Sequence, residues 1–133
     1  MGRLPGESVS VVIAAREPLQ RSIYEALTDG GHTVAETCSA LADTLAAVRR
    51  LHPDVCIVDR ELPGGGLAAI AALAGRGRRP QVIVIGGESP AEVRAARLAG
   101  AAECLPESVE PDELAAAVSA AAGSKTQGRK EQR

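Results

Sequence analysis

Short runs of aliphatic and β-branched residues alternate along this chain with segments in which apolar residues recur every three or four positions. The apolar runs expected to form strands lie at 9–14, 33–35, 55–58, 82–85 and 103–105. The run at 55–58 is apolar without alternation, which is typical of a central strand covered on both faces. Strands that alternate with helical segments predict a five-stranded parallel sheet between two layers of helices, a three-layer α/β/α fold.

The helix boundaries are marked by residues that commonly start or end helices. The predicted helices begin at Pro18, after Ser39, at Leu67, at Pro90 and at Pro111. Ser39 is read as a helix cap, and the sequence from Ser89 to Glu92 predicts a capping box with proline at the first helical position. The weak run at 33–35 predicts a strand that is short or near the edge of the sheet.

Composition supports one layered domain. The chain has 133 residues, enough for one compact domain and too few for two. Its only aromatic residue is Tyr24, so the core is built from Val, Ile, Leu and Ala. Small side chains fill an interior only when helices and sheet approach closely, which favours packed layers over a loose bundle.

Charge divides the chain into an acidic body and a basic end. The net charge is −2, and residues 123–133 carry +3, which leaves −5 on residues 1–122. We therefore predict a flexible N-terminus at 1–7, a folded domain at 8–122 and a disordered basic tail or linker at 123–133. An acidic body does not attract nucleic acid, so direct DNA binding by the domain is not expected.

The cysteines and the apolar runs indicate the compartment. Cys38, Cys56 and Cys104 are odd in number and form no CxxC pair, so neither a disulfide framework nor a zinc site is predicted. No run approaches about 18 apolar residues, the length that spans a bilayer. We predict a cytoplasmic protein with no membrane role.

Asp59 follows the apolar run at 55–58 and precedes Arg60-Glu61-Leu62-Pro63-Gly64. This pattern, together with segments 14–19 and 98–114, resembles the receiver domains of two-component response regulators, especially those with a LuxR-type DNA-binding domain. The resemblance covers residues 8–122. It implies a doubly wound, flavodoxin-like (CheY-like) sheet with the functional groups at the carboxyl ends of the strands. It also implies that Asp59 occupies the phospho-acceptor position.

The chain departs from the family pattern around Asp59. The replaced positions are Ala15 and Arg16 for an acidic pair that helps to bind Mg²⁺, Gly86 for a Ser or Thr, Cys104 for an aromatic residue and Glu107 for a Lys. Like charges about 4 Å apart repel by about 4 kcal/mol at an effective dielectric of about 20, so Glu107 opposes a phosphoryl group. Mg²⁺-dependent phosphorylation is therefore expected to be impaired or absent, and no cofactor is expected.

Three residues keep two readings each. Asp59 is either an acceptor or an inherited carboxylate that is now only ion-paired. Arg16 either pairs with Asp59 where a metal ion would lie or is a solvated side chain. Glu17 is either a displaced metal ligand or a carboxylate stabilised at the start of a helix.

Three functions are weighed. The first is a signalling interaction module, not an enzyme, that binds a protein partner or a second copy through its fourth helix, fifth strand and last helix. The second is a working phospho-receiver in which Asp59 accepts phosphate from a histidine kinase, with Mg²⁺ as cofactor, and controls a transcriptional output. The third is a small flavodoxin-like enzyme, which the lack of a His, Ser or Lys constellation at the strand ends disfavours. Whether a DNA-binding domain follows residue 133 in the native protein stays open.

Overall fold

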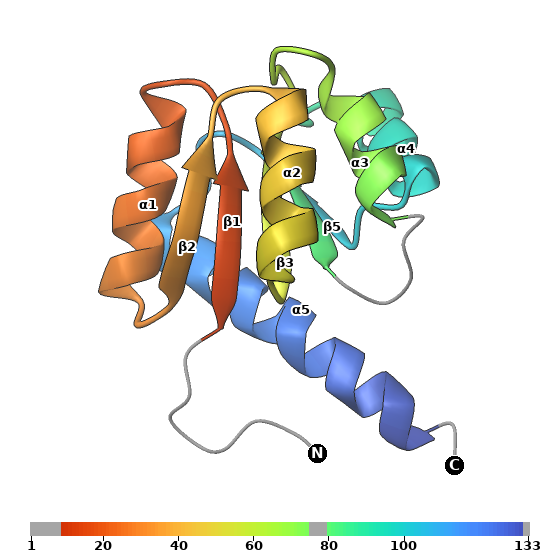
Figure 1. Cartoon of the computed structure of the whole chain (residues 1–133). Helices are drawn as coiled ribbons and strands as arrows, with labels where there is room; N and C mark the ends of the chain where they lie inside the picture. The colour runs from red at the N-terminus through yellow and green to blue at the C-terminus, as the bar shows by residue number, and fades with distance from the viewer. Residues whose placement is uncertain (1–8, 75–79, 132–133) are drawn as a thin grey trace.

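The computed structural model describes residues 9–74 and 80–131, with side chains up to residue 123. Its five parallel strands are β1 (Ser10–Ala14), β2 (Thr33–Cys38), β3 (Val55–Asp59), β4 (Gln81–Ile85) and β5 (Glu103–Leu105). They form one sheet in the order β2-β1-β3-β4-β5 (Figure 1). This is the flavodoxin-like order implied by the resemblance, with β3 at the centre.

Helices cover both faces of the sheet. They are α1 (Leu19–Asp29), α2 (Leu41–Leu51), α3 (Gly66–Ala74), α4 (Pro90–Ala99) and α5 (Pro111–Glu131). Helices α1 and α5 lie on one face of the sheet, and α2, α3 and α4 lie on the other (Figure 1). The predicted three-layer architecture is confirmed.

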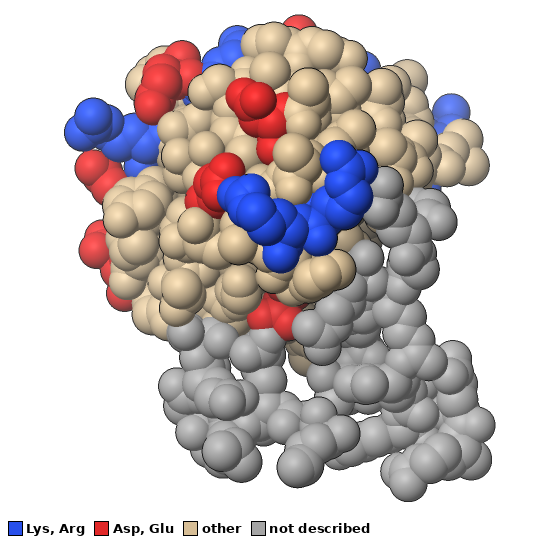
Figure 2. Space-filling model, in the orientation of Figure 1, with Lys and Arg blue, Asp and Glu red and all other residues tan. Residues whose placement is uncertain are grey.

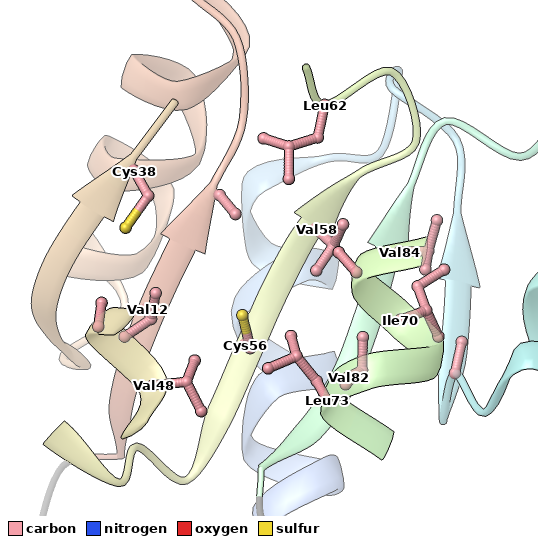
Figure 3. Packing of buried hydrophobic residues seen from close by; sticks show 14 of the residues in the cluster. Val12, Cys38, Val48, Cys56, Val58, Leu62, Ile70, Leu73, Val82 and Val84 are labelled. Carbon is pink, nitrogen blue, oxygen red and sulfur yellow. The ribbon is translucent and has the colours of Figure 1, made fainter. Parts of the chain in front are cut away.

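The strands divide their side chains between two apolar cores, because successive residues of a strand point to opposite faces. Ile13, Ile57 and Ile83 face α1 and α5. Val58 and Val84 lie in the other core, together with residues of α2, α3 and α4 (Figure 3). All five residues of β3 are buried, as expected for the central strand. Asp59 is the last residue of β3, so the position of this strand in the sheet buries Asp59.

Two local predictions need correction. The second strand runs over Thr33–Cys38, longer than predicted, although it does lie at the edge of the sheet. Its exposed residues Thr33, Ala35 and Thr37 alternate with less exposed ones, as on an edge strand with one solvated face. The polar residues Thr33, Glu36 and Thr37 hid this segment as a strand. Ser39 is not the cap of α2, because Ala40 is the N-cap and makes no side-chain cap hydrogen bond. The capping box of Ser89 and Glu92 is confirmed.

The last helix, α5, extends further towards the end of the chain than the sequence predicted. The backbone of α5 is helical through Glu131, across most of the segment for which we predicted a disordered tail. After Pro111 at its start the helix contains no further proline, so backbone hydrogen bonding continues through Gly123 and Gly128. The predicted flexible segment 1–7 and the basic residues 76–79 lie outside the described residues. Within the described part, no helix is both long and apolar enough to span a membrane.

Candidate functional site

Asp59 ends β3 at the carboxyl edge of the sheet. It pairs in register with Ile85 of β4, and the preceding Val58 pairs with Ala14 of β1. Its side chain has no solvent exposure. A buried carboxylate is costly unless it is hydrogen-bonded and paired with a positive charge. The loops that follow β1, β3 and β5 supply the groups that satisfy this requirement or lie beside it.

Arg16 binds the carboxylate of Asp59 through three hydrogen bonds. Its Nε donates to Oδ2 at 2.7 Å, its Nη2 donates to Oδ1 at 3.1 Å, and its backbone N–H donates to Oδ2 at 3.0 Å. The backbone N–H of Glu61 donates to Oδ1 at 2.8 Å. A carboxylate offers about four lone-pair sites, so these four donors fill its accepting capacity.

The charge state of Asp59 follows from these contacts. Burial of the carboxyl group raises its pKa, but hydrogen bonds from the Arg16 side chain, the Arg16 backbone and the Glu61 backbone outweigh burial, so the pKa of Asp59 is lowered. The same side-chain hydrogen bond raises the pKa of Arg16. Both groups are therefore charged at neutral pH, and the pair is a bidentate ion pair.

Glu107 adds a second carboxylate to the guanidinium. Its Oε2 lies 3.4 Å from Nη2 of Arg16, and its side chain is 50% exposed. The guanidinium therefore contacts two carboxylates, one buried and one half exposed. A lysine at this position would face Arg16 with a like charge, so the acidic residue at 107 is compatible with the arginine at 16.

Gly86 lies beside this pair without contributing a side chain. Its φ is +123°, and a Cβ built there would lie 3.2 Å from Cβ of Arg60 and 4.0 Å from Oε2 of Glu107. Residues with a side chain are strained at this φ. A Ser or Thr at position 86 would thus need a different backbone.

The remaining predicted positions lie around the pair. Ala15 is fully buried in the core beneath α1 and α5. The Oε1 of Glu17 accepts a hydrogen bond from the backbone N–H of Arg21 at 3.3 Å, a helix-terminal contact of the kind weighed against a metal role. Burial raises the pKa of the Cys104 thiol, and its sulfur accepts a hydrogen bond from the backbone N–H of Gly87.

The donor set around Asp59 does not fit Mg²⁺. The ion needs several oxygen ligands in an octahedron, whereas the Asp59 oxygens are taken by nitrogen donors and a cation already neutralises them. Among the described residues, no three His, Cys, Asp or Glu side chains are placed to hold a metal ion.

We predict that millimolar Mg²⁺ leaves the melting temperature of this protein unchanged. A ligand raises the melting temperature only if it binds the native state. Differential scanning fluorimetry with and without Mg²⁺ measures this, with Ca²⁺ and a matched ionic strength as controls. An upward shift that disappears in the Asp59→Asn variant would contradict the prediction.

Comparison with known proteins identifies the family. A family model described as Response regulator receiver domain matches residues 11–119. The chain therefore belongs to the response-regulator receiver domains, which as a class are signalling modules that interact with histidine kinases and effector domains.

Solved structures agree with this assignment. The signal receiver domain of the response regulator NarL from Mycobacterium tuberculosis is 30% identical with a TM-score of 0.82, and the match covers 88% of this chain and 98% of that one. A LuxR-family regulator from Aurantimonas sp. SI85-9A1 is 21% identical (TM-score 0.78, 89% and 87% covered). A CheY-like receiver from Methanospirillum hungatei is 16% identical (TM-score 0.81, 92% and 99% covered), and these last two structures support the fold alone. None of the curated proteins matches this chain.

Sequence reasoning missed two contacts near the site. Arg60 lies 3.5 Å from the carboxylate of Glu92 at the start of α4. Cys104 packs so closely on Gly87 that a Cβ there would lie 2.4 Å from its sulfur. The position of Arg60 directly after Asp59 was visible in the sequence, but Glu92 was already assigned to the capping box.

Proposed function

We propose that this receiver domain acts mainly as a protein–protein interaction module in two-component-type signalling, with impaired Mg²⁺-dependent phosphorylation. The observation that carries the proposal is the bidentate pairing of Arg16 with Asp59, which together with two backbone N–H donors fills the accepting capacity of the carboxylate. A nucleophilic oxygen must be free to attack an incoming phosphoryl group. In this site, attack requires Arg16 to leave first.

Charge opposes the product as well as the attack. A phosphoryl group on Asp59 would add a charge of about −2 to a site that already contains the carboxylate of Glu107 at its edge. Arg16 would offset part of this repulsion, but it would then have to serve the phosphoryl group and Glu107 together. We therefore infer that a phosphorylated state is less favourable here than in a receiver with a metal ion and a lysine.

The site also lacks side chains through which a phosphoryl group could change the conformation of the domain. A phosphoryl group shifts a conformational equilibrium only through contacts that differ between the two states. Gly86 has no hydroxyl that could bind a phosphoryl oxygen. At position 104, where the family has an aromatic side chain that can move, the small Cys104 packs against Gly87. We therefore infer that the surface formed by α4, β5 and α5 keeps one conformation whether or not Asp59 is phosphorylated.

The proposed interaction surface is this α4-β5-α5 face. A shallow groove of about 580 Å³ runs along α4, lined by Glu88, Pro90, Val93, Arg94, Arg97 and Leu98. Leu98 is 81% exposed there and is flanked by two arginines. A protein segment with an apolar side chain between acidic residues complements this groove. A second copy of the chain is the alternative occupant, which sedimentation of the isolated protein would reveal.

Other surfaces give less reason for a partner. On the face shown in Figure 2, basic side chains lie among acidic ones rather than forming a broad basic surface. Such a mixture is typical of a solvated surface and offers no footprint for nucleic acid. We keep the cytoplasm as the proposed compartment.

Beryllofluoride, a mimic of the acyl phosphate, tests the proposed lack of a switch. Amide chemical shifts over residues 86–108 are expected to stay unchanged when beryllofluoride and Mg²⁺ are added, because the Asp59 oxygens are occupied. The Asp59→Asn variant is the control for non-specific effects of the salt. Localised shifts along this segment in the wild type, absent from the control, would favour a working phospho-receiver that controls a transcriptional output.

A further inference from the structure

Arg60 connects the acceptor strand to β4 and to the loop after it. Its backbone N–H donates to the carbonyl of Ile85 at 2.9 Å. Its Cβ would lie 3.2 Å from a Cβ built at Gly86, so a side chain at position 86 would be tightly packed against Arg60. The Arg60 side chain is only 24% exposed, so most of it is covered by the protein. Arg60 therefore packs against the residue that follows β4, directly after the acceptor strand.

The guanidinium of Arg60 ends at the first turn of α4. Its Nη1 lies 3.5 Å from Oε2 of Glu92 and 3.6 Å from Oε2 of Glu61. The other oxygen of Glu92, Oε1, accepts hydrogen bonds from the backbone N–H groups of Glu88 and Ser89. One carboxylate thus joins the N-terminal cap of α4 to the loop after Asp59.

The Nε of Arg60 is buried without a hydrogen-bond partner. A buried donor without a partner is unfavourable, so an arginine with a choice of positions would turn this group to water. The Arg60 side chain keeps this position because its Cβ packs against Gly86 and its guanidinium pairs with Glu92. Both contacts bind it to the segment that begins α4.

We propose that Arg60 is a positioning residue that holds the first turn of α4 against the loop after Asp59, through Glu92. Among the described residues, neither the Arg60 nor the Glu92 side chain pairs with the Asp59 carboxylate, although Glu61, the other partner of Arg60, donates its backbone N–H to that carboxylate. The link through Glu92 fixes α4, and hence the groove on α4, in one position. This inference goes beyond the proposed function, which rests on the pairing of Arg16 with Asp59 and would stand without it.

The test compares amide hydrogen exchange over residues 86–99 in the full chain. Arg60→Ala removes the guanidinium and keeps the Cβ over Gly86. Glu92→Gln keeps an oxygen that accepts from the cap and removes the negative charge. Each variant is expected to raise exchange in the first turn of α4 by up to about fivefold, because local opening there loses a restraint of the strength of an exposed ion pair. Arg60→Lys, which keeps the charge, should recover part of the protection.

Arg94→Ala is the matched control, because Arg94 is an exposed arginine on the same helix. It should leave exchange in this segment unchanged. Exposed ion pairs contribute little to global stability, so the melting temperature should barely move in any variant. Unchanged exchange in both Arg60→Ala and Glu92→Gln, or an equal rise in Arg94→Ala, would overturn the proposal. Intact mass after treatment with a phosphodonor reports separately on the proposed function.

Discussion

The Arg16→Leu variant is expected to unfold with a free energy about 2 kcal/mol lower than the wild type at pH 7. The substitution leaves the Asp59 carboxylate buried with only its backbone donors, and breaking a buried pair from one side costs about 3–5 kcal/mol. The value is reduced here because the Arg16 side chain is 42% exposed and two backbone N–H groups remain. Urea denaturation measures the difference.

The deficit should also depend on pH in a defined direction. The folded state lowers the pKa of Asp59 below its unfolded value of about 3.9, so the pair stabilises the protein above that pH. This contribution disappears as the pH falls through the folded pKa. Wild type and variant should therefore converge in stability in acid. Arg49→Leu, at an exposed position on α2, is the matched control. Equal stability of the wild type and Arg16→Leu at pH 7 would mean that the pair contributes nothing.

The fold was predictable because several independent signals agreed. Apolar runs marked the strands, and Ser89 with Glu92 marked the start of α4 as the structure has it. The errors fell where local signals were weak. Ser39 has a cap-forming side chain, but the helix begins one residue later, and the edge strand at Thr33–Cys38 has too many polar residues to stand out.

The site was only partly predictable. Alignment with the family placed Arg16 and Glu107 near Asp59, but it gave no distances and left a solvated Arg16 as the alternative reading. The bidentate geometry depends on the path of the chain after β1, which no residue pattern fixes. The contact between Arg60 and Glu92 joins residues far apart in the chain, and Glu92 already had a local explanation in the capping box.

The Arg16→Asp/Glu107→Lys variant is expected to gain phosphorylation on Asp59. It removes the cation from the Asp59 oxygens, supplies a second carboxylate for Mg²⁺ and replaces a repelling charge with an attracting one. We expect at least about a tenfold rise in modified protein over the wild type, because reversing a charge near a phosphoryl group is worth several kcal/mol. The position of Gly86 limits the gain, since no hydroxyl can be restored there without strain.

Each substitution alone separates the two contributions. Arg16→Asp frees the carboxylate but keeps the repulsion from Glu107, and Glu107→Lys keeps Arg16 on the carboxylate. Both single variants should therefore fall well short of the double variant. If Glu107→Lys alone became fully reactive, the pairing of Arg16 with Asp59 would not be what limits the reaction.

The most direct test of the central claim is the intact mass of the wild-type protein after incubation with a small phosphodonor and Mg²⁺. The claim is that Arg16 binds the oxygens of the Asp59 carboxylate and thereby prevents them from binding a metal ion or accepting a phosphoryl group. It predicts an unchanged mass for the wild type under conditions in which the Arg16→Asp/Glu107→Lys variant is modified. An added phosphoryl group on the wild type, absent from Asp59→Asn, would contradict it.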